Sequence, residues 1–96
     1  MKFEWDINKA ELNIKNHGVS FDEAIEAFYD PNVIRGFDAE HSEDEERFYI
    51  IGFSSQRLLF VIYAERIGSD TIRIITARRA EAKYQKEYTE ENYGTE

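Results

Sequence analysis

The amino-acid sequence predicts an α+β protein, in the element order β-α-α-β-β-β-β-α. Three observations carry this prediction. Helix start and stop signals fill residues 6–31, runs rich in β-branched and aromatic residues fill residues 47–76, and helical spacing of apolar residues returns after residue 77. A chain of 96 residues fits one domain, so we expect a single domain over residues 1–96, with an antiparallel sheet covered by helices on one face.

The first two elements are a short strand and a helix. Phe3 and Trp5 alternate with polar residues, which indicates a strand over residues 1–5. Asp6 is a suitable N-cap for a helix over residues 7–16, and Gly18 has the position of a C-terminal glycine. We expect the apolar face of this helix to consist of Ile7, Ala10 and Ile14.

The clearest helix start signal in the sequence lies at residues 20–23. Ser20 and Glu23 have the spacing of a capping box, in which each residue satisfies a backbone N–H of the other. Asp30-Pro31 ends the helix. Its apolar positions follow helical spacing at Phe21, Ala24, Ile25 and Phe28.

The second half is predicted to consist of strands over residues 33–37, 47–53, 58–66 and 71–76, followed by a helix. Short turns join the last three strands, so an antiparallel meander is expected. The helix is expected to begin at Ala77, because residues 77, 80, 84 and 88 form one helical stripe, and residues 92–96 are expected to fray. Alternation in the last strand places Arg73 and Ile75 on one face, with Ile72, Ile74 and Thr76 on the other.

Charge separates the last strand and helix from the rest of the chain. The formal net charge is -8, which argues against nucleic-acid binding by the whole surface. Residues 71–86 reverse the sign, with five basic residues and one acidic residue, Glu81. The sequence has no cysteine, no apolar run of membrane-spanning length and no signal-peptide pattern, so we expect a soluble cytoplasmic protein.

Two segments contain residues suited to chemistry on a phosphate. In the acidic segment 38–47, most carboxylates fit a solvated loop, whereas His41, Glu46 and Arg47 suit proton transfer and phosphate binding. Metal binding by Asp38, Glu40 and His41 is a third interpretation, although these residues lack a recognised ligand spacing. In the basic segment, Arg78 stands at the expected junction of strand and helix, where its guanidinium can bind a phosphate.

Other candidate residues have more ordinary explanations. His17 and Lys15 lie at a helix C-terminus, where cations offset the helix dipole. Most aromatic residues are expected in the core, but Tyr63 and Tyr84 are kept as groups that can position a nucleobase or share in proton transfer. The signatures of P-loop nucleotide hydrolases, dinucleotide-binding folds, serine hydrolases and zinc proteases are absent from the sequence.

Several ordered motifs over residues 3–88 resemble the BrnT family of toxins. The motifs are Phe3-Glu4-Trp5-Asp6, Asn13, Lys15-Asn16-His17-Gly18-Val19-Ser20-Phe21, Glu23-Ala24, Asp38, His41, Glu45-Glu46-Arg47, Gly52, Arg73 to Ala80, and Tyr88. The resemblance implies a RelE-like fold and a ribonuclease toxin of a type II toxin–antitoxin pair. Such toxins cut RNA without a metal or other cofactor and inhibit translation. It also implies a BrnA-like antitoxin partner, a toxin–antitoxin hetero-oligomer, and contact with DNA only through the antitoxin.

This resemblance suggests roles for the candidate residues, but the sequence does not decide which residue has which role. RNA cleavage by the 2′-OH needs a base, an acid and a cation for the phosphorane. His41 or Glu46 can serve as base or acid, Arg47 and Arg78 can hold the phosphate, and Lys15, Arg73, Arg79 and Lys83 can support RNA binding. Thr76 stands where the family usually has Ser. The acidic net charge favours an alternative, an inactive homologue that serves as a protein-binding module in autoregulation.

Overall fold

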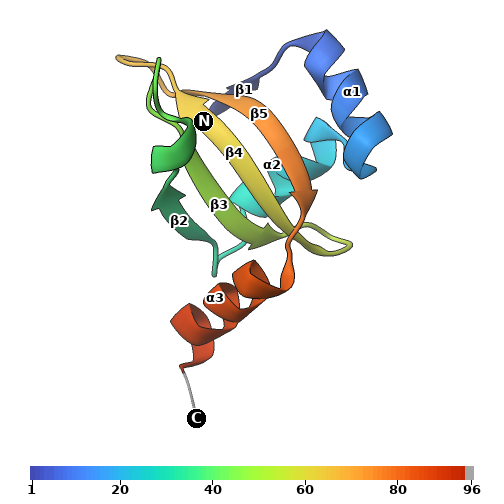
Figure 1. Ribbon diagram of the computed structural model, residues 1–96, viewed down its shortest axis with the longest axis vertical. Coiled ribbons are helices and arrows are strands. Elements are labelled where there is room, and N and C mark those ends of the chain that lie inside the picture. Colours follow the sequence, from blue (N-terminus) through green and yellow to red (C-terminus); the bar gives the residue numbers. More distant parts are fainter. Residues whose placement is uncertain (95–96) are drawn as a thin grey trace.

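A computed structural model describes residues 1–94 and confirms the predicted element order. Five strands form one sheet, in the order β1-β5-β4-β3-β2 (Figure 1). The strands are β1 (Lys2–Glu4), β2 (Ile34–Phe37), β3 (Phe48–Phe53), β4 (Leu58–Glu65) and β5 (Thr71–Arg79). No helix in the described part of the chain is long and apolar enough to cross a membrane.

The antiparallel meander is confirmed, but the sheet as a whole is mixed. β2, β3, β4 and β5 pair antiparallel with their neighbours. β1 pairs parallel with β5, with Phe3 opposite Ile72, so the prediction of a wholly antiparallel sheet was wrong for this strand. Its direction depends on a partner far away in the sequence, and the local alternation from which β1 was predicted contains no information about that partner.

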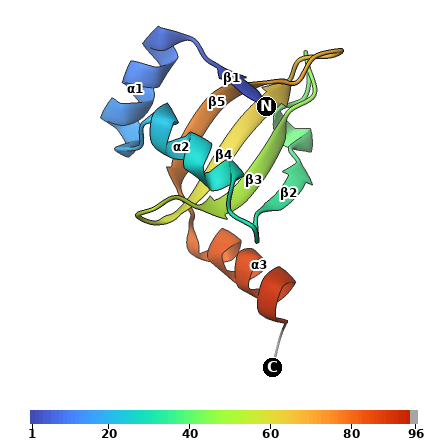
Figure 2. The same cartoon turned by 180° about the vertical axis from the view of Figure 1, so that it is seen from behind.

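Helices α1 (Ile7–His17) and α2 (Phe21–Phe28) cover one face of the sheet, as Figure 2 shows. Asp6 caps α1 through hydrogen bonds from the N–H groups of Asn8 and Lys9, and Gly18 ends it with φ 68°, a left-handed conformation that glycine adopts without strain. Both predicted caps are therefore confirmed. The core on this face includes Val19, Phe21, Ile50, Leu59, Val61, Tyr63 and Ile74.

The buried face of α1 differs from the predicted one. Ala10 is buried, but Ile7 and Ile14 are 69% and 51% exposed. The other buried residue is Asn13, whose amide nitrogen donates to the carbonyls of Val19 and Ala77, at 2.8 Å each. Its amide oxygen accepts from the N–H of Ala77 at 3.1 Å. β1 pairs with β5 only as far as Arg73. Asn13 bonds the β5 backbone farther along, at Ala77, and this polar contact joins α1 to the sheet.

The predicted capping box at α2 is present only in part. The N–H of Glu23 donates to the Ser20 hydroxyl at 3.0 Å, as expected. The Glu23 carboxylate, however, accepts from the hydroxyl of Ser54 at 2.7 Å and from two nitrogens of Arg57, at 3.0 and 2.8 Å. Glu23 is buried and holds the turn between β3 and β4 against α2, a long-range role that the capping-box spacing does not reveal.

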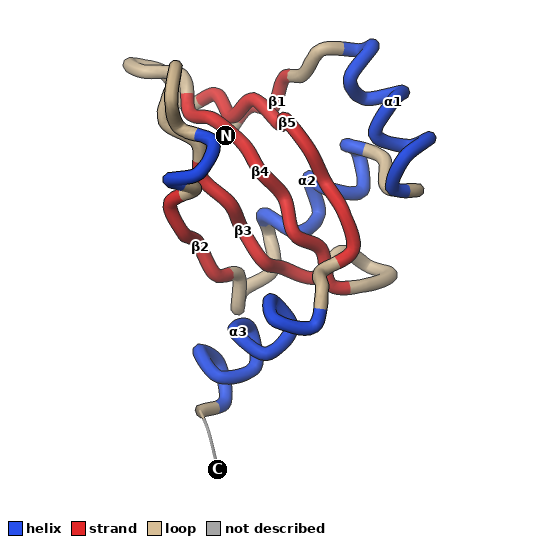
Figure 3. Tube along the Cα trace, in the orientation of Figure 1, coloured by secondary structure: helices blue, strands red, loops and turns tan. Residues whose placement is uncertain are grey.

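Helix α3 (Ala82–Tyr93) lies at one end of the sheet, apart from α1 and α2 (Figure 3). Its Tyr88 and half-buried Tyr84 pack with Phe60, Ile62 and Ile75 in a second core, so the helices do not all cover one face. The predicted helix start at Ala77 was wrong, because residues 77–79 pair with β4 and extend β5. Of the end expected to fray, Asn92 and Tyr93 belong to α3, and residues 95–96 lie outside the described residues.

Candidate active site

The face of the sheet opposite α1 and α2 presents three cross-strand rows of side chains. Residues directly opposite each other in antiparallel strands project to the same face. Ala64, Ile62 and Phe60 of β4 belong to the second core and mark this face. Register places Arg73 beside Ala64, Tyr49 and Thr76 beside Ile62, and Ile51 and Arg78 beside Phe60. Arg47 immediately precedes β3 and continues the first row.

A β-bulge in β5 decides which arginines share this face. The β4–β5 register shifts between Ile62 and Tyr63, so that Thr76 pairs with Ile62 while Ile74 pairs with Tyr63. One extra residue on a strand reverses the alternation after it. Arg78 therefore lies on the same face as Arg73, and the prediction that Thr76 shares the face of Ile72 and Ile74 was wrong.

The same reversal separates Arg79 from Arg78. Arg79 is exposed and lies opposite Leu59, which belongs to the core under α1 and α2. Uninterrupted alternation would have grouped Arg79 with Arg73 and left Arg78 on the other face. Of these two arginines, Arg78 therefore shares a face with Arg47 and Arg73, and Arg79 does not.

Three buried side-chain polar atoms within residues 1–94 lack a hydrogen-bond partner: Arg47 Nε, Thr76 Oγ1 and Arg78 Nε. Most buried polar atoms in folded proteins are paired, and an unpaired one calls for an explanation such as a role in binding or catalysis. Register places Thr76 and Arg78 on the face of Ile62 and Phe60, and Arg47 precedes β3 on the side of Tyr49. Thr76, in the part of β5 that β1 does not cover, also lines a hollow with residues of α1. This face therefore holds two guanidinium Nε–H groups and a hydroxyl whose hydrogen-bonding capacity the described residues leave unused.

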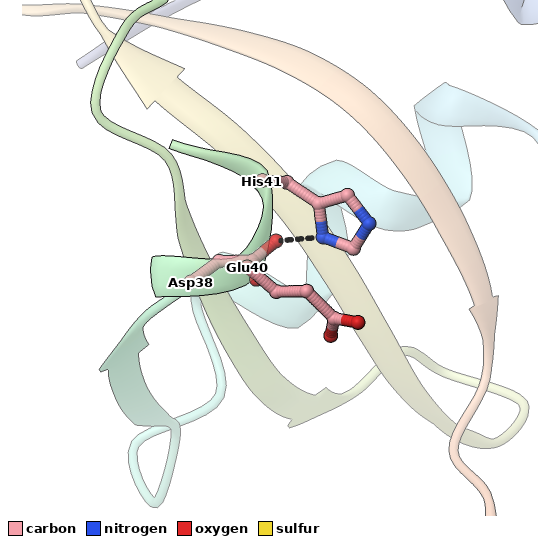
Figure 4. Close-up of side chains that lie close together, drawn as sticks. All are labelled: Asp38, Glu40 and His41. Atoms are coloured by element: carbon pink, nitrogen blue, oxygen red, sulfur yellow. Dashed lines mark hydrogen bonds and ion pairs between the residues drawn. The ribbon is translucent and has the colours of Figure 1, made fainter. Parts of the chain in front are cut away.

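His41 lies in a short 3-10 helix, η1 (Ala39–His41), which follows β2. Its Nδ1 is 2.9 Å from Oδ2 of Asp38. Figure 4 draws this contact as a dashed line. The carboxylate orients the imidazole and leaves Nε2 as the other ring nitrogen for proton transfer. The His41 side chain is 52% exposed and the Asp38 side chain is 12% exposed, so His41 is the solvent-facing member of the pair.

The segment between β2 and β3 is closed by three hydrogen bonds that fix His41 relative to Arg47. The N–H of Asp38 donates to the carbonyl of Arg47 at 2.8 Å. The Ser42 hydroxyl donates to the carbonyl of Asp38 at 2.6 Å and accepts from the N–H of Arg47 at 2.9 Å. The sequence predicted His41 and Arg47 as site residues, and these hydrogen bonds close the segment that contains both.

The third interpretation, a metal site, has a partial geometric basis. Asp38, Glu40 and His41 each offer one ligand atom, and these atoms lie within 4.8 Å of one another. Carboxylate oxygens and an imidazole nitrogen are ligands that several divalent metals accept. The hydrogen bond between Asp38 and His41 already occupies Nδ1 of the imidazole and Oδ2 of the carboxylate.

The acidic segment contacts β5 at Arg73. Glu45 forms an ion pair with Arg73, and the same carboxylate oxygen lies 3.8 Å from a guanidinium nitrogen of Arg47. Glu46, predicted as an acid or base, is exposed and lines a hollow that Glu45, Arg73 and Arg66 also line.

Arg78 lies at the other end of the same face. The row of Arg73 and the row of Arg78 lie four positions apart along β4, a spacing of roughly 13 Å. Its guanidinium is 3.9 Å from the Glu81 carboxylate. The acidic segment therefore contacts β5 at Arg73. The row of Tyr49 and Thr76 lies between that contact and Arg78.

The remaining predicted RNA-binding residues are dispersed. Lys15 is exposed in the last turn of α1, the helix on the opposite face of the sheet. Lys83 is exposed on α3, with its ammonium 4.9 Å from the centre of the Tyr84 ring. Of the two tyrosines kept as candidates, Tyr63 is fully buried in the core under α2. Tyr84 is half-buried on the side of the sheet that carries Arg78.

Tyr49 is a site residue that the sequence reasoning did not single out. It occupies the middle row, and its hydroxyl donates to the carboxylate of Glu87 in α3 at 3.1 Å. Burial and the hydrogen bond to Glu87 raise the pKa of Tyr49 to about 12, so the phenol stays neutral. The available signal was its alternation with Arg47 and Ile51 in the predicted strand, which places all three on one face.

Comparison with known proteins identifies the family. No curated protein matches the chain significantly. A family model described as "Ribonuclease toxin, BrnT, of type II toxin-antitoxin system" matches residues 5–83. This range includes all of the sheet beyond β1, the segment with His41 and Arg47, and the start of α3. The chain therefore belongs to the BrnT family of ribonuclease toxins of type II toxin–antitoxin systems.

Proposed function

We propose that this protein is an active endoribonuclease that cleaves RNA without a metal ion and thereby inhibits translation. The single observation that supports this proposal most directly is the set of unpaired buried atoms, Arg47 Nε, Thr76 Oγ1 and Arg78 Nε, on one face of the sheet. Donors held ready in a partly buried site bind an anion more strongly than donors in bulk water. The phosphate backbone of RNA is the anion that fits a ribonuclease family.

The proposed reaction is attack of a ribose 2′-OH on the adjacent phosphorus. The new bond is 2′-O–P, the broken bond is P–5′-O, and the products end in a 2′,3′-cyclic phosphate and a 5′-OH. A base takes the 2′-OH proton and an acid protonates the leaving 5′-oxygen. His41, oriented by Asp38, is proposed for one of these proton transfers. The guanidinium groups of Arg47 and Arg78 stabilise the charge of the phosphorane.

The acidic composition affects how RNA reaches this site. Carboxylates at Glu45 and Glu81 already neutralise part of the charge of Arg73, Arg47 and Arg78. A net charge of -8 repels RNA at long range. We therefore propose local contacts at the arginines, rather than a broad basic surface, as the source of RNA binding.

The proposed partner is a basic, BrnA-like antitoxin that joins the toxin in a cytoplasmic hetero-oligomer and provides its only contact with DNA. Type II systems pair a toxin with a protein antitoxin, and the acidic surface of this chain complements a basic protein. Exposed Ile7, Leu12 and Ile14 on α1 add apolar surface that a protein partner can bury.

The purified protein tests the activity directly. Wild type is expected to cleave single-stranded RNA in the presence of excess EDTA, leaving cyclic-phosphate ends. Arg78→Ala is expected to lower the cleavage rate by about 100-fold, as for loss of one charge-stabilising donor. Arg79→Ala is the matched control, because this neighbouring arginine belongs to the opposite face, and it is expected to keep most of the activity.

Growth experiments separate the proposal from its alternative. Induction of the chain alone is expected to stop growth and shorten cellular RNAs, and co-expression of a BrnA-like antitoxin is expected to restore growth. Normal growth and intact RNA, with folded protein present, would support the inactive binding module instead. Cleavage that stops on adding EDTA and returns with a divalent cation would contradict the metal-free reaction and point to Asp38, Glu40 and His41.

A further inference from the structure

Tyr84 forms the outer layer of an aromatic stack beside Arg78. Its ring lies 4.1 Å from that of Phe60, centre to centre, with the planes 20° apart. Phe60 also stacks on Tyr49, at 5.2 Å and 27°. Phe60 is only 6% exposed, whereas Tyr84 is half-buried, so Tyr84 covers Phe60 on the solvent side. Two inner rings therefore fix the orientation of Tyr84.

The other side of the Tyr84 ring faces a cation rather than a packed side chain. Because Phe60 occupies one side of the ring, the ammonium of Lys83, 4.9 Å from the ring centre, lies over the other. Lys83 is exposed, and a cation over an exposed aromatic ring contributes only weakly to stability. A planar ligand can therefore displace the ammonium without breaking a core contact.

The register of the sheet places this ring next to the proposed phosphate site. Arg78 lies directly opposite Phe60, the residue on which Tyr84 stacks. Side chains that face each other in antiparallel strands are close neighbours, with Cβ atoms about 5 Å apart. The unpaired Nε of Arg78 and the ring of Tyr84 are thus adjacent groups on one face.

We infer that the outer face of Tyr84 is a stacking platform for a nucleobase of the RNA, next to the phosphate that Arg78 binds. The inference rests on the proposed function and adds a base-binding subsite to it. Stacking on an aromatic ring is tolerant of base identity, because every base has a π face. The Lys83 ammonium then leaves the ring and binds the phosphate backbone, while the base takes its place on the Tyr84 ring.

Binding of a short RNA in which every ribose carries a 2′-O-methyl group tests the platform without cleavage. Tyr84→Leu keeps an apolar cover on Phe60 but removes the π face, and it is expected to weaken binding by about tenfold in fluorescence anisotropy. Tyr84→Phe and Tyr84→Trp are expected to bind at least as well as wild type. Equal affinity of the Leu variant and wild type would overturn the platform.

A series of oligonucleotides, each with one abasic position, separates stacking from a structural effect of the substitution. Wild type is expected to lose about tenfold in affinity at one position, and Tyr84→Leu is expected to be insensitive there. No sensitive position in wild type would overturn the platform even if the Leu variant fails to fold. Cleavage of unmodified RNA is measured in parallel. Binding and abasic sensitivity without cleavage would contradict the proposed function alone, and absence of RNA binding would overturn both.

Discussion

Glu45 forms an ion pair with Arg73, and this contact joins the acidic segment between β2 and β3 to the last strand of the sheet. The same carboxylate lies 3.8 Å from the guanidinium of Arg47, so one acidic side chain partly neutralises two of the arginines proposed for RNA. A phosphate that approaches Arg47 or Arg73 must compete with it. Glu45 thus has the position of an internal competitor for the anion.

Glu45→Gln is therefore expected to strengthen RNA binding. The substitution keeps the size of the side chain and removes the competing charge. The gain is expected to be about twofold to fivefold, since the partners are about 40% exposed and solvent screens the pair. Anisotropy with 2′-O-methyl RNA at two salt concentrations measures it. Glu43→Gln, on an exposed residue of the same segment, is the control, and an equal gain in both variants would indicate a general charge effect.

Asn13→Ala is expected to destabilise the protein by about 3 kcal/mol. The substitution leaves the N–H and carbonyl of Ala77 and the carbonyl of Val19 without their partner in a buried environment. The free energy of unfolding is measured by urea denaturation. Asn16→Ala is the matched control on an exposed position of the same helix, and it is expected to change stability by less than about 0.5 kcal/mol. Equal losses in the two variants would contradict the role of Asn13.

Local signals predicted the elements of this fold better than their long-range contacts. Asp6 and Gly18 mark the ends of α1 because a cap is a contact within a few residues. The predicted buried face of α1 did not include Asn13, because its partner Ala77 is 64 residues away. Glu23 was assigned to a capping box on spacing alone, whereas its carboxylate pairs with Arg57.

The candidate site was limited in the same way. His41 and Arg47 were predicted together because they lie in one short segment, which hydrogen bonds to Arg47 close at its ends. The faces of β5 were not predictable, because the bulge near Ile75 depends on pairing with β4, and strict alternation separates Arg73 from Arg78. Glu46 lines a hollow with Arg66 and Arg73, and its proposed role as acid or base stays a prediction.

Acid is expected to destabilise the protein partly through Glu23. The hydrogen bond from Arg57, opposed by burial and aided by Ser54, holds the pKa of Glu23 below its ordinary value of 4.5. A group with a lowered pKa in the folded state contributes stability that is fully present above its unfolded pKa. That contribution is lost as pH falls below about 4.5 and passes through the lowered folded-state pKa. Thermal unfolding of wild type between pH 7 and pH 3 measures this loss.

Glu23→Gln should reduce the pH dependence over the acidic range, because the variant has no carboxyl group to protonate at this position. Its stability at pH 7 is expected to be lower by about 3 kcal/mol, since Arg57 loses a buried charged partner. Glu11→Gln, on an exposed carboxylate of α1, should keep the slope of wild type. A Glu23→Gln profile parallel to that of wild type would show that other carboxyl groups cause the acid loss.

Gly36→Ala is expected to disturb Tyr49. A methyl group at Gly36 would overlap the outer atoms of the Tyr49 ring, which lies across β2. The ring cannot move freely, because it stacks on Phe60 and its hydroxyl is held by Glu87. We expect a loss of about 1–3 kcal/mol in unfolding free energy, as for overpacking of a core. A lower cleavage rate is also expected, because the middle row between Arg47 and Arg78 is displaced.

A double-mutant cycle isolates this contact. Tyr49→Ala alone destabilises by removing the stacked ring and leaving Glu87 unpaired, but it also clears the space above Gly36. Adding Gly36→Ala to that variant is therefore expected to change stability by less than about 0.5 kcal/mol, so the two effects are far from additive. Additive losses would mean that Gly36→Ala acts on the backbone of β2 and not through the ring. The position of the Tyr49 ring would then depend on its contacts with Phe60 and Glu87 and not on β2.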